Sequence, residues 1–350
     1  MRAVVIDAVR AQPEVREVPD PVAPDGGVVV RVGATGLCRS DWHAWAGHDD
    51  IAWPHVPGHE LAGEVVAVGA GVRRWAAGDR VTVPFVCGCG RCAWCAAGDA
   101  QVCPDQQQPG FTHWGSFAEL VPLHAADTNL VALPDTVDDT TAASLGCRFA
   151  TAYRGLVARA QVREGEWVVV VGAGGVGLSA VMVARALGAQ VIAVDRHQGA
   201  LDVASSLGAE HVLLADGGDD LPEALVETLA DLTAGGAHVA VDAVGSEQTA
   251  ATAIHSLRRR GRHVQVGLLP AVDGHPRMPM GRVIAWELDL LGSHGMAAAD
   301  YPGMLDLVVA GTLAPRRLVE RTIGLAEAAE LLPVFDTVPV AGITVIDPTR

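Results

Sequence analysis

The sequence predicts an α/β protein that combines a doubly wound, parallel six-stranded sheet with a second, irregular domain of antiparallel strands. Two patterns along the chain carry this prediction. Short β-type runs broken by glycine and proline fill residues 1–150, whereas strand and helix patterns alternate from about Thr151 onward. In addition, five of the seven cysteines fall between Cys87 and Cys103, and clustered cysteines in an intracellular chain are more often metal ligands than disulfides.

The first domain is predicted over residues 1–150. Its β-type runs are short, and their spacing and turn residues suit an irregular antiparallel domain better than a helical one. The expected strands are Ala3–Ile6, Gly27–Val32, Glu64–Val68 and Arg80–Val83.

The second domain is predicted over residues 151–292, where six β-rich runs alternate with helical patterns. Trp167–Val171 is a valine-rich strand, and Leu178–Leu187 is a helix that ends at Gly188. Buried-type strands separated by helices predict a doubly wound parallel sheet. The further strands are Val191–Val194, His211–Leu214, His238–Val241, His263–Val266 and Leu288–Leu291, with helices Leu221–Leu232 and Glu247–Arg259 between them. The tail, residues 293–350, breaks this rhythm and ends in the β-type run Ile343–Ile346.

Length and charge exclude several classes of protein. A chain of 350 residues exceeds the ~100–200 residues of a usual domain, which agrees with two domains. The 25 Lys and Arg against 41 Asp and Glu give a net charge of −16, which argues against nucleic-acid or anionic-membrane partners because phosphate binding needs a basic face. The run Ala3–Ile6 is too short for a secretory signal, and glycines divide the uncharged stretch Trp167–Ala184 into a strand and a helix. We therefore expect a soluble, cytoplasmic protein.

A GxGxxG motif, formed by Gly172, Gly174 and Gly177, lies between the valine-rich strand and the following helix. In this context the glycines permit a tight turn and a close approach of the backbone to a pyrophosphate at a helix N-terminus. Asp195 ends the next strand, where its carboxylate can accept hydrogen bonds from adenosine ribose hydroxyls. The alternative is an ordinary tight turn with a capping aspartate. Because Asp195 repels a 2′-phosphate, NAD is favoured over NADP, although Arg196 could accommodate that phosphate.

Four cysteines follow one another in the spacing C-x2-C-x2-C-x7-C. Four thiolates so close in sequence can close a tetrahedron around Zn²⁺, and an all-thiolate shell indicates a structural site. The alternatives are a redox dithiol, which needs a single CxxC at a strand–helix junction, and a nucleic-acid zinc module, which needs a basic surface. Cys87 is left over, either as a spare thiol or as a substitute for the first ligand. The predicted ligands are Cys89, Cys92, Cys95 and Cys103.

Cys38, His59 and Cys147 form a dispersed set from separate segments. Two thiols and one imidazole can hold Zn²⁺ and leave one tetrahedral position open for water or substrate. Taken singly, each residue could also be purely structural, because lone cysteines are usually buried apolar residues and a lone histidine usually lies in the core or at the surface.

Together these motifs resemble the medium-chain, zinc-dependent alcohol dehydrogenase family from end to end. The run G-H-E-x2-G-x5-G-x2-V that begins at Gly58 matches the zinc signature of that family at every position. Four further features match the family: the string C-R-S-D that begins at Cys38, the four-cysteine segment Cys89–Cys103 (the cysteine lobe), Cys147, and the glycine-rich turn. The resemblance implies a GroES-like β-barrel catalytic domain at 1–150 with both zinc sites, a Rossmann NAD(P)-binding domain at 151–292, and a return to the catalytic domain at 293–350.

The resemblance also implies a role for each matching residue. Cys38, His59 and Cys147 would be ligands of a catalytic zinc, and Glu60 would lie near the metal and could ligate it transiently. Asp41 would hydrogen-bond the His59 ring and fix its tautomer. Ser40 and His43 would form a proton relay. The implied cofactor contacts are Arg39 at the pyrophosphate, Thr151 near the nicotinamide, and Gly172, Gly174, Gly175, Val176, Gly177, Asp195, Arg196 and Val266.

The reaction that the resemblance implies is the oxidation of an alcohol to an aldehyde or ketone, or its reverse. Zinc would lower the pKa of the alcohol, whose proton would leave through Ser40, the cofactor ribose and His43, while the hydride passes to NAD. The expected cofactors are two zinc ions per chain and NAD. The expected partners are a small alcohol or aldehyde and further copies of the chain, in a homodimer or homotetramer formed through the Rossmann domains.

Arg148 departs from the family pattern, in which many relatives carry glycine after the third ligand. It could bind a coenzyme phosphate, pair with a carboxylate, or lie solvated at a domain edge. Polyol dehydrogenases of the family often replace the third thiolate by a carboxylate, so the retention of Cys147 favours simple alcohols over sugars.

Phe85, by its position before the cysteine lobe, would wall the substrate site, with Leu268 and His294 approaching from the Rossmann domain. The tryptophans Trp42, Trp45 and Trp53 suggest an apolar mouth, or else they pack the β domain. His48, His55 and His113 are expected to be structural or surface residues.

The substrate is expected to be a primary or secondary alcohol of apolar or aromatic character. Two alternatives remain open. One is a polyol or amino-alcohol dehydrogenase on the same scaffold, and the other is a zinc-containing protein without activity.

Overall fold

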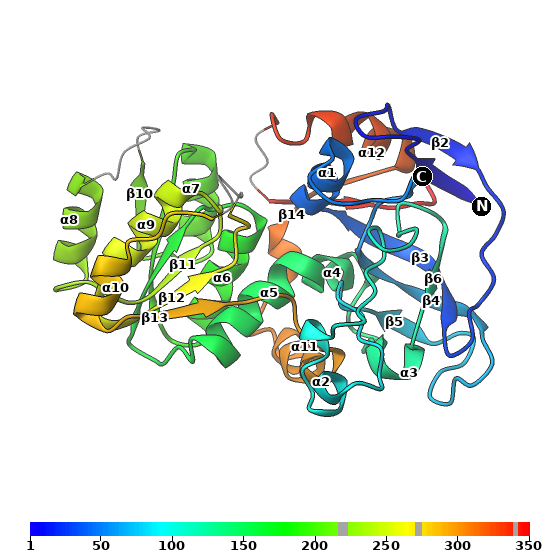
Figure 1. Cartoon of the computed structure of the whole chain (residues 1–350), viewed down its shortest axis with the longest axis horizontal. Coiled ribbons are helices and arrows are strands. Elements are labelled where there is room, and N and C mark those ends of the chain that lie inside the picture. Colours follow the sequence, from blue (N-terminus) through cyan, green and yellow to red (C-terminus); the bar gives the residue numbers. More distant parts are fainter. Residues whose placement is uncertain (216–222, 270–274, 339–341) are drawn as a thin grey trace. The chain divides into compact units, whose positions relative to one another are not determined.

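The computed structural model describes residues 1–215, 223–269, 275–338 and 342–350. The chain divides into two compact units. The first unit contains Met1–Ala150 and most of the residues after Gly295, and the second contains Thr151–His294. Figure 1 shows a mixed β-rich fold in the first and a layered α/β fold in the second.

The first unit is built on a seven-stranded sheet with the order β14-β15-β3-β4-β5-β7, in which β6 also pairs with β3. All pairs in it are antiparallel except β14 with β15. Val28, Val30 and Val32, which share one face of β3 because side chains alternate along a strand, are buried in one apolar cluster. The strands are β3 (Val28–Leu37), β4 (Glu60–Val68), β5 (Arg80–Thr82), β6 (Leu120–Leu123), β7 (Val131–Ala132), β14 (Val319–Ile323) and β15 (Ile343–Ile346), and a separate pair is formed by β1 (Arg2–Val5) and β2 (Glu14–Glu17).

Short helices connect these strands. They are α1 (Arg39–Ala46), α2 (Ala93–Ala96), α3 (Ala126–Asn129), α4 (Asp139–Ser144), α11 (Tyr301–Val309) and α12 (Leu325–Leu331), with single turns η1 (Ala100–Val102), η2 (Leu145–Phe149), η4 (Ala298–Asp300), η5 (Pro315–Leu318) and η6 (Leu332–Val334). The predicted irregular β domain is therefore confirmed, and the tail adds a strand, β14, that the sequence pattern did not reveal.

The second unit contains a six-stranded, fully parallel sheet with the order β10-β9-β8-β11-β12-β13. Its central strand β8 is buried throughout Val168–Val171, because helices cover both faces of such a sheet. The strands are β8 (Trp167–Val171), β9 (Gln190–Asp195), β10 (His211–Leu214), β11 (Ala237–Asp242), β12 (Leu257–Gln265) and β13 (Asp289–Gly292), and the helical segments are α5 (Ala150–Arg154), η3 (Gly155–Arg159), α6 (Gly175–Ala186), α7 (Gln198–Ser206), α8 (Glu223–Leu232), α9 (Glu247–His255) and α10 (Met280–Trp286).

One predicted boundary in this unit was wrong. The helix expected over Glu247–Arg259 ends at His255, and Leu257 already begins β12. Leu257 is fully buried and pairs with Ala237 of β11, so the sheet contact outweighs the local helical pattern. The first two residues of the expected helix Leu221–Leu232 lie outside the described residues.

The stretch Trp167–Ala184 forms β8, a turn and most of α6, as its glycines predicted. Within the described part of the chain, the helices are all too short or too polar to cross a membrane.

Candidate active site

Asp41 organises the first segment of the site. It lies in the first turn of α1 and is fully buried. Its carboxylate accepts hydrogen bonds from the backbone N–H of Cys38 at 2.9 Å and from the N–H of Gly58 at 3.0 Å. A buried carboxylate requires such partners. Asp41 therefore fixes the start of α1 against the segment that leads into β4.

His59 is held by the same carboxylate. Its Nδ1 lies 3.0 Å from Oδ1 of Asp41, and both side chains are fully buried. This contact fixes the ring orientation and directs Nε2 to the opposite side. Nε2 is buried and has no hydrogen-bond partner among the described residues. Since an orphaned buried nitrogen is costly, this atom calls for a ligand that is absent from the protein atoms themselves.

Cys147 comes from a distorted helical turn. Helix α4 begins at the N-cap Asp138, whose carboxylate accepts the N–H of Thr141 at 2.7 Å. The helix then opens into the π-turn η2, where Gly146 adopts the non-helical angles φ −56° and ψ −119°. Such π-turns occur frequently at functional sites. This one places Cys147 beside the β3–α1 junction and the start of β4.

These segments bring together Cys38, His59, Glu60 and Cys147, whose potential ligand atoms all lie within 4.8 Å of one another. Around a tetrahedral Zn²⁺, with bonds of about 2.0–2.3 Å, ligand atoms lie about 3.3–3.8 Å apart. Two thiols, a buried imidazole nitrogen without a partner and a carboxylate are a donor set that suits zinc. The residues present therefore fit the metal that the sequence predicts.

Arg148 forms an ion pair with Glu60 inside this group. Its backbone N–H and its Nε donate to Oε1 of Glu60 at 3.0 and 3.1 Å, and its Nη2 contacts Oε2. Arg148 is 6% exposed and Glu60 is fully buried, so the interpretation as a solvated arginine was wrong. Burial raises the pKa of Glu60, against the opposing charge of Arg148. Pairing with a carboxylate was one of the open alternatives, and Glu60 is that carboxylate.

The expected relay residues lie on α1. Oγ of Ser40 is 3.8 Å from Sγ of Cys38, which places the hydroxyl beside the candidate zinc ligands. Nδ1 of His43 lies 2.8 Å from Nδ1 of His48, which is exposed, as expected for a surface residue, and also contacts a relay candidate. Arg39, the implied pyrophosphate contact, forms an exposed ion pair with Asp336, with Nη1 and Oδ1 at 2.6 Å.

Aromatic rings flank the four candidate metal ligands, Cys38, His59, Glu60 and Cys147. The ring centroid of Phe85 lies 6.0 Å from that of His59, and the centroid of Phe111 lies 5.2 Å from it. Phe111 was missed, because no motif or periodicity distinguishes it. Tyr301 of α11 was also missed. It is fully buried, and burial raises the pKa of its hydroxyl, with further contributions from Cys147 and Glu60.

The three tryptophans differ in surroundings. Trp42 lies edge-on to His43 and His48, with ring centroids 5.1 and 5.5 Å away. Trp45 donates its Nε1–H to the carbonyl of Ala11, which fits a packing role, and Trp53 lies against His55. Trp42 is thus the one of the three beside an expected relay residue.

The second thiol group is the cysteine lobe. Sγ of Cys92 lies 3.5 Å from Sγ of Cys95 and 3.7 Å from Sγ of Cys103, and the backbone N–H of Cys89 points at Sγ of Cys103. Disulfides have S–S bonds of about 2.05 Å, so these thiols are free. All four potential ligand atoms lie within 4.8 Å of one another, which suits a closed zinc site made of four thiolates.

Cys87 is separate from this lobe. It is buried in the apolar core of the first unit, and burial raises its pKa to about 12. In contrast, hydrogen bonding from the backbone N–H of Arg91 lowers the pKa of Cys89 to about 6. Because the ligand atom of Cys89 lies within 4.8 Å of those of Cys92, Cys95 and Cys103, the geometry favours Cys89, rather than Cys87, as the first member of the lobe.

Replacing Cys92 by serine should remove the zinc of the lobe and leave the other cluster intact. Because closed zinc sites contribute directly to folding, the thermal midpoint should fall by roughly 5–10 °C. Metal analysis and thermal unfolding check this, with Cys87→Ala as the control that keeps its metal. Full metal content in the Cys92→Ser chain would contradict the assignment.

The glycine-rich turn in the second unit has the expected form. A Cβ at Gly177 would lie 1.7 Å from the carbonyl oxygen of Gly172, so only glycine permits this close packing. A Cβ at Gly174, the N-cap of α6, would meet nothing within 4 Å, which leaves space above the helix N-terminus. Asp195 accepts the backbone N–H of Ala173 at 2.6 Å and that of His197 at 2.9 Å. The open N-terminus fits a pyrophosphate.

The other residues implied for this unit have mixed surroundings. The carbonyl of Thr151 accepts a hydrogen bond from Oγ of Ser293 at 3.0 Å, and the N–H of Val266, just after β12, donates to Asp242. Arg196, Leu268 and His294 are exposed; Gly175 and Val176 form the first turn of α6.

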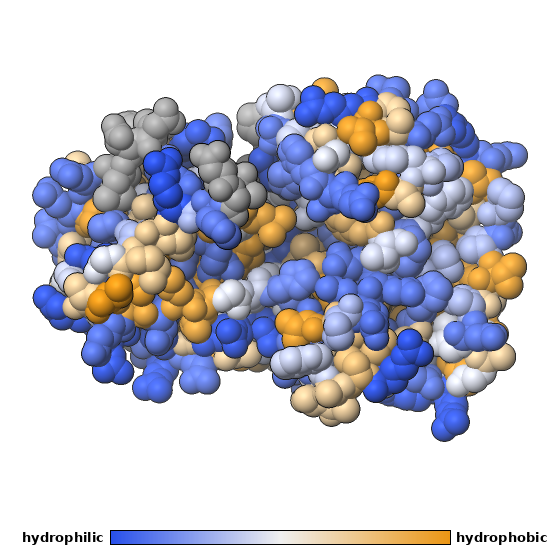
Figure 2. Space-filling model, in the orientation of Figure 1, coloured by the Kyte–Doolittle hydropathy of each residue, from blue (hydrophilic) through white to orange (hydrophobic). Residues whose placement is uncertain are grey.

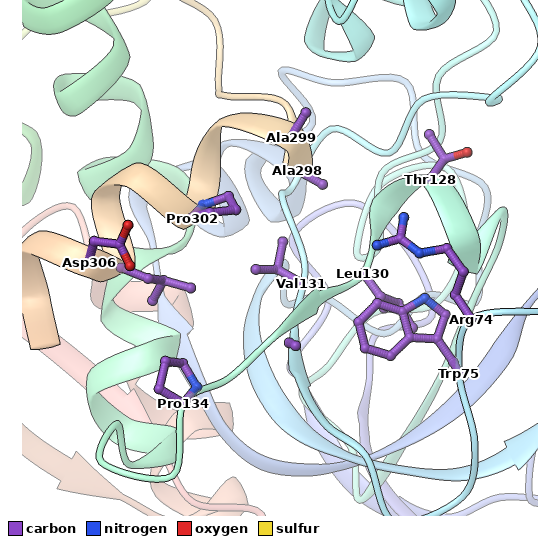
Figure 3. Close-up of a pocket in the computed structure, with 12 residues that line it drawn as sticks. Arg74, Trp75, Thr128, Leu130, Val131, Pro134, Ala298, Ala299, Pro302 and Asp306 are labelled. Carbon is purple, nitrogen blue, oxygen red and sulfur yellow. The ribbon is translucent and has the colours of Figure 1, made fainter.

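A surface cavity of about 370 Å³ in the first unit lies apart from these groups (Figure 3). Its ionisable lining residues are Arg74 and Asp306. Arg74 donates to the carbonyl of Asp127 at 2.9 Å and lies against the ring of Trp75, so it has a structural role. The cavity contains none of the candidate ligands and carries no chemistry of this site.

Comparisons with known proteins agree with this arrangement. Residues 24–135 match the family described as alcohol dehydrogenase GroES-like domain, and residues 175–310 match the family described as zinc-binding dehydrogenase. An alcohol dehydrogenase of Geobacillus stearothermophilus is 36% identical over 77% of this chain and 78% of its own. A sorbitol dehydrogenase of Halalkalibacterium halodurans is 32% identical over 89% of each. A solved NAD-dependent alcohol dehydrogenase superimposes with a TM-score of 0.88 at 31% identity, over 99% of both chains.

Proposed function

The chain belongs to the zinc-dependent medium-chain alcohol dehydrogenase family, and from that premise we propose that it transfers a hydride between an apolar or aromatic alcohol and NAD. The product is an aldehyde or ketone, and the reverse reaction reduces a carbonyl. The observation that carries the proposal is that Cys38, His59 and Cys147 come together in the fold. Nε2 of His59 is buried in this group and has no hydrogen-bond partner among the described residues.

Cys38, His59 and Cys147 would hold the catalytic zinc. When bound, zinc supplies Lewis-acid polarisation of the alcohol hydroxyl. The residues of the chain orient the zinc ligands and remove the proton of the alcohol. Asp41 keeps Nε2 of His59 turned toward the two thiols. The hydroxyl of Ser40, beside Cys38, accepts the alcohol proton and passes it toward His43.

Glu60 would not be a permanent zinc ligand. Since Arg148 engages both of its oxygens, we assign to Glu60 a role in balancing the charge around the metal, with transient ligation requiring the ion pair to open. Cys89, Cys92, Cys95 and Cys103 would hold a second, structural zinc, which gives two ions per chain.

NAD would bind at the glycine-rich turn, with its pyrophosphate above Gly174 at the N-terminus of α6 and its adenosine ribose at Asp195. A carboxylate at the end of β9 disfavours the 2′-phosphate of NADP. Thr151, Val266 and Arg39 would supply further contacts to the cofactor. When bound, the nicotinamide would supply the hydride acceptor.

The proposed substrate preference rests on the aromatic rings around His59 and on the retained thiol at Cys147. Phe85 and Phe111 offer apolar contact beside the metal group, and Trp42 does so near the relay. Leu268 and His294 would contribute from the second unit. A polyol dehydrogenase is the second candidate, favoured by the similarity to the sorbitol dehydrogenase.

The chain would act as a homodimer or homotetramer. Figure 2 shows apolar side chains gathered over α10 and β13 of the second unit. Ile284 is 74% exposed, and Met280 and Leu290 are also exposed. Because β13 is the edge strand of its sheet, this surface suits association with a second copy.

The test is the formation of NADH by the zinc-loaded chain with benzyl alcohol, ethanol or sorbitol, each with NAD and with NADP. We expect kcat/KM for benzyl alcohol with NAD to exceed the other combinations by at least about tenfold, which corresponds to about 1.4 kcal/mol. Sorbitol as the best substrate would favour the polyol candidate. A preference for NADP would contradict the cofactor assignment, and no turnover with any alcohol would contradict the proposed function.

A further inference from the structure

Two histidines lie in contact at the end of α1. His43 is in the last turn of the helix, and Gly47 ends it in the left-handed conformation, with φ 83°. The turn brings His48 back, so that its backbone N–H donates to the carbonyl of His43 at 3.0 Å. The two rings then meet with their Nδ1 atoms 2.8 Å apart, and Trp42 lies edge-on to both.

The contact has a specific chemical meaning. An Nδ1–Nδ1 distance of 2.8 Å is a hydrogen bond, in which one ring donates and the other accepts. Since the two Nδ1 atoms are hydrogen-bonded to each other, the Nε2 atom of each ring is the one that can exchange protons with other groups or with water. An imidazole that receives a proton at one nitrogen can release another from its second nitrogen. The pair therefore has the atoms needed to move a proton through two rings in series.

We propose that His48 is a second relay residue, which takes the proton of the reaction from His43 and delivers it to solvent. This inference rests on the proposed function. The alcohol proton reaches Nε2 of His43, the Nδ1 proton of His43 passes to Nδ1 of His48, and a proton leaves Nε2 of His48 to water. One proton enters and one leaves, with no change of oxidation state. Because His48 is exposed, exchange with solvent restores the starting tautomers.

The charges around His43 suit this role. Besides His48, the groups that act on it are Arg39 of the same helix, Asp49 after the turn and Asp336 beyond η6. Partial burial first, and then His48 and Arg39, lower the pKa of His43, whereas the two aspartates oppose the shift. A lowered pKa favours the neutral form of the His43 ring, which can accept a proton.

The alternative is that the pair only fastens the end of α1. If the contact is only structural, its loss changes thermal stability and added bases do not restore the rate. If His48 is a relay residue, its loss lowers kcat in a way that added bases restore, while KM and metal content stay in place. The two roles therefore differ in measurable ways.

The experiment compares the zinc-loaded wild-type chain with His48→Gln, and uses His275→Gln, an exposed histidine of the second unit, as the control. We expect kcat for alcohol oxidation at pH 7 to fall about tenfold in His48→Gln, part of the ~10²–10⁴-fold that general-base relays contribute. KM and zinc content should stay unchanged. The rise of kcat with pH should move to higher pH, because His48 no longer lowers the pKa of His43. A hindered pyridine base such as lutidine should restore part of the rate.

An unchanged kcat and pH profile in His48→Gln would overturn the proposal. So would a lower kcat that added base does not restore, whether or not the pH profile moves. If wild type oxidises alcohols but His48→Gln behaves like the control, only the second relay step fails. If wild type oxidises no alcohol, the proposed function fails, and the relay with it.

Discussion

Replacing Cys38 by serine should abolish turnover and lower the metal content by one zinc ion per chain. Serine is close to cysteine in size, so Asp41 can still accept the N–H of residue 38 and the fold should persist. A hydroxyl, however, is a far poorer zinc ligand than a thiolate. Removal of a single group that stabilises the transition state costs about 10²–10³-fold in kcat, and loss of the metal should cost at least that.

Metal analysis and NADH formation check this prediction together. Cys87→Ala is the matched control, because Cys87 is equally buried but lies in the apolar core, outside both thiol groups. Cobalt substitution adds an independent readout, since a thiolate–cobalt absorption band should weaken in Cys38→Ser and not in Cys87→Ala. A Cys38→Ser chain with full activity and full metal content would refute the catalytic zinc assignment.

Replacing Arg148 by methionine should destabilise the first unit by roughly 3–5 kcal/mol, the usual cost of removing one partner of a buried ion pair. Glu60 is fully buried and Arg148 donates to both of its oxygens, so methionine would leave a buried carboxylate without its charge partner. The pocket is tight, because a Cβ at Gly36 would lie 2.2 Å from Oε2 of Glu60. Water cannot easily enter to replace the lost hydrogen bonds. Unfolding by urea, followed in the metal-loaded chain, measures the effect.

The double variant Arg148→Met with Glu60→Gln is the control for this second prediction. A neutral amide does not need a cationic partner, so the double variant should recover a large part of the stability lost in Arg148→Met. The Arg148→Lys variant should be less stable than the double variant, because a lysine cannot reproduce the forked donor geometry of a guanidinium. If Arg148→Met is as stable as wild type, the ion pair contributes nothing measurable and the role assigned to Arg148 is wrong.

Much of the site could be predicted from sequence because its chemistry requires particular residue types in particular order. The spacing of the lobe cysteines is typical of a zinc site, and the glycines around Gly174 are typical of a dinucleotide-binding turn. The grouping of Cys38 and His59 with Cys147 was less determined by spacing, since it depends on how β3, β4 and η2 meet. The family resemblance supplied what the spacing alone could not.

Other features could not be predicted, because they depend on contacts between distant segments. Arg148 could equally have been a solvated residue until Glu60 was found beside it. Phe111 carries no local pattern, and Leu257 continues a helical pattern although it pairs with β11. The contact of His48 with His43 was not predicted, because a sequence does not show that the chain turns back at Gly47. In each case a single long-range or turn contact determined the outcome.

The carboxylate of Asp41 has a consequence for how the proposed zinc site would take up its metal. It holds the backbone at Cys38, the backbone at Gly58 and the ring of His59 through protein contacts alone. Two of the three proposed zinc ligands, Cys38 and His59, would thereby be preorganised before an ion arrives, so little conformational entropy would remain to be lost on metal binding. The affinity for the ion should accordingly depend on a residue that never touches it.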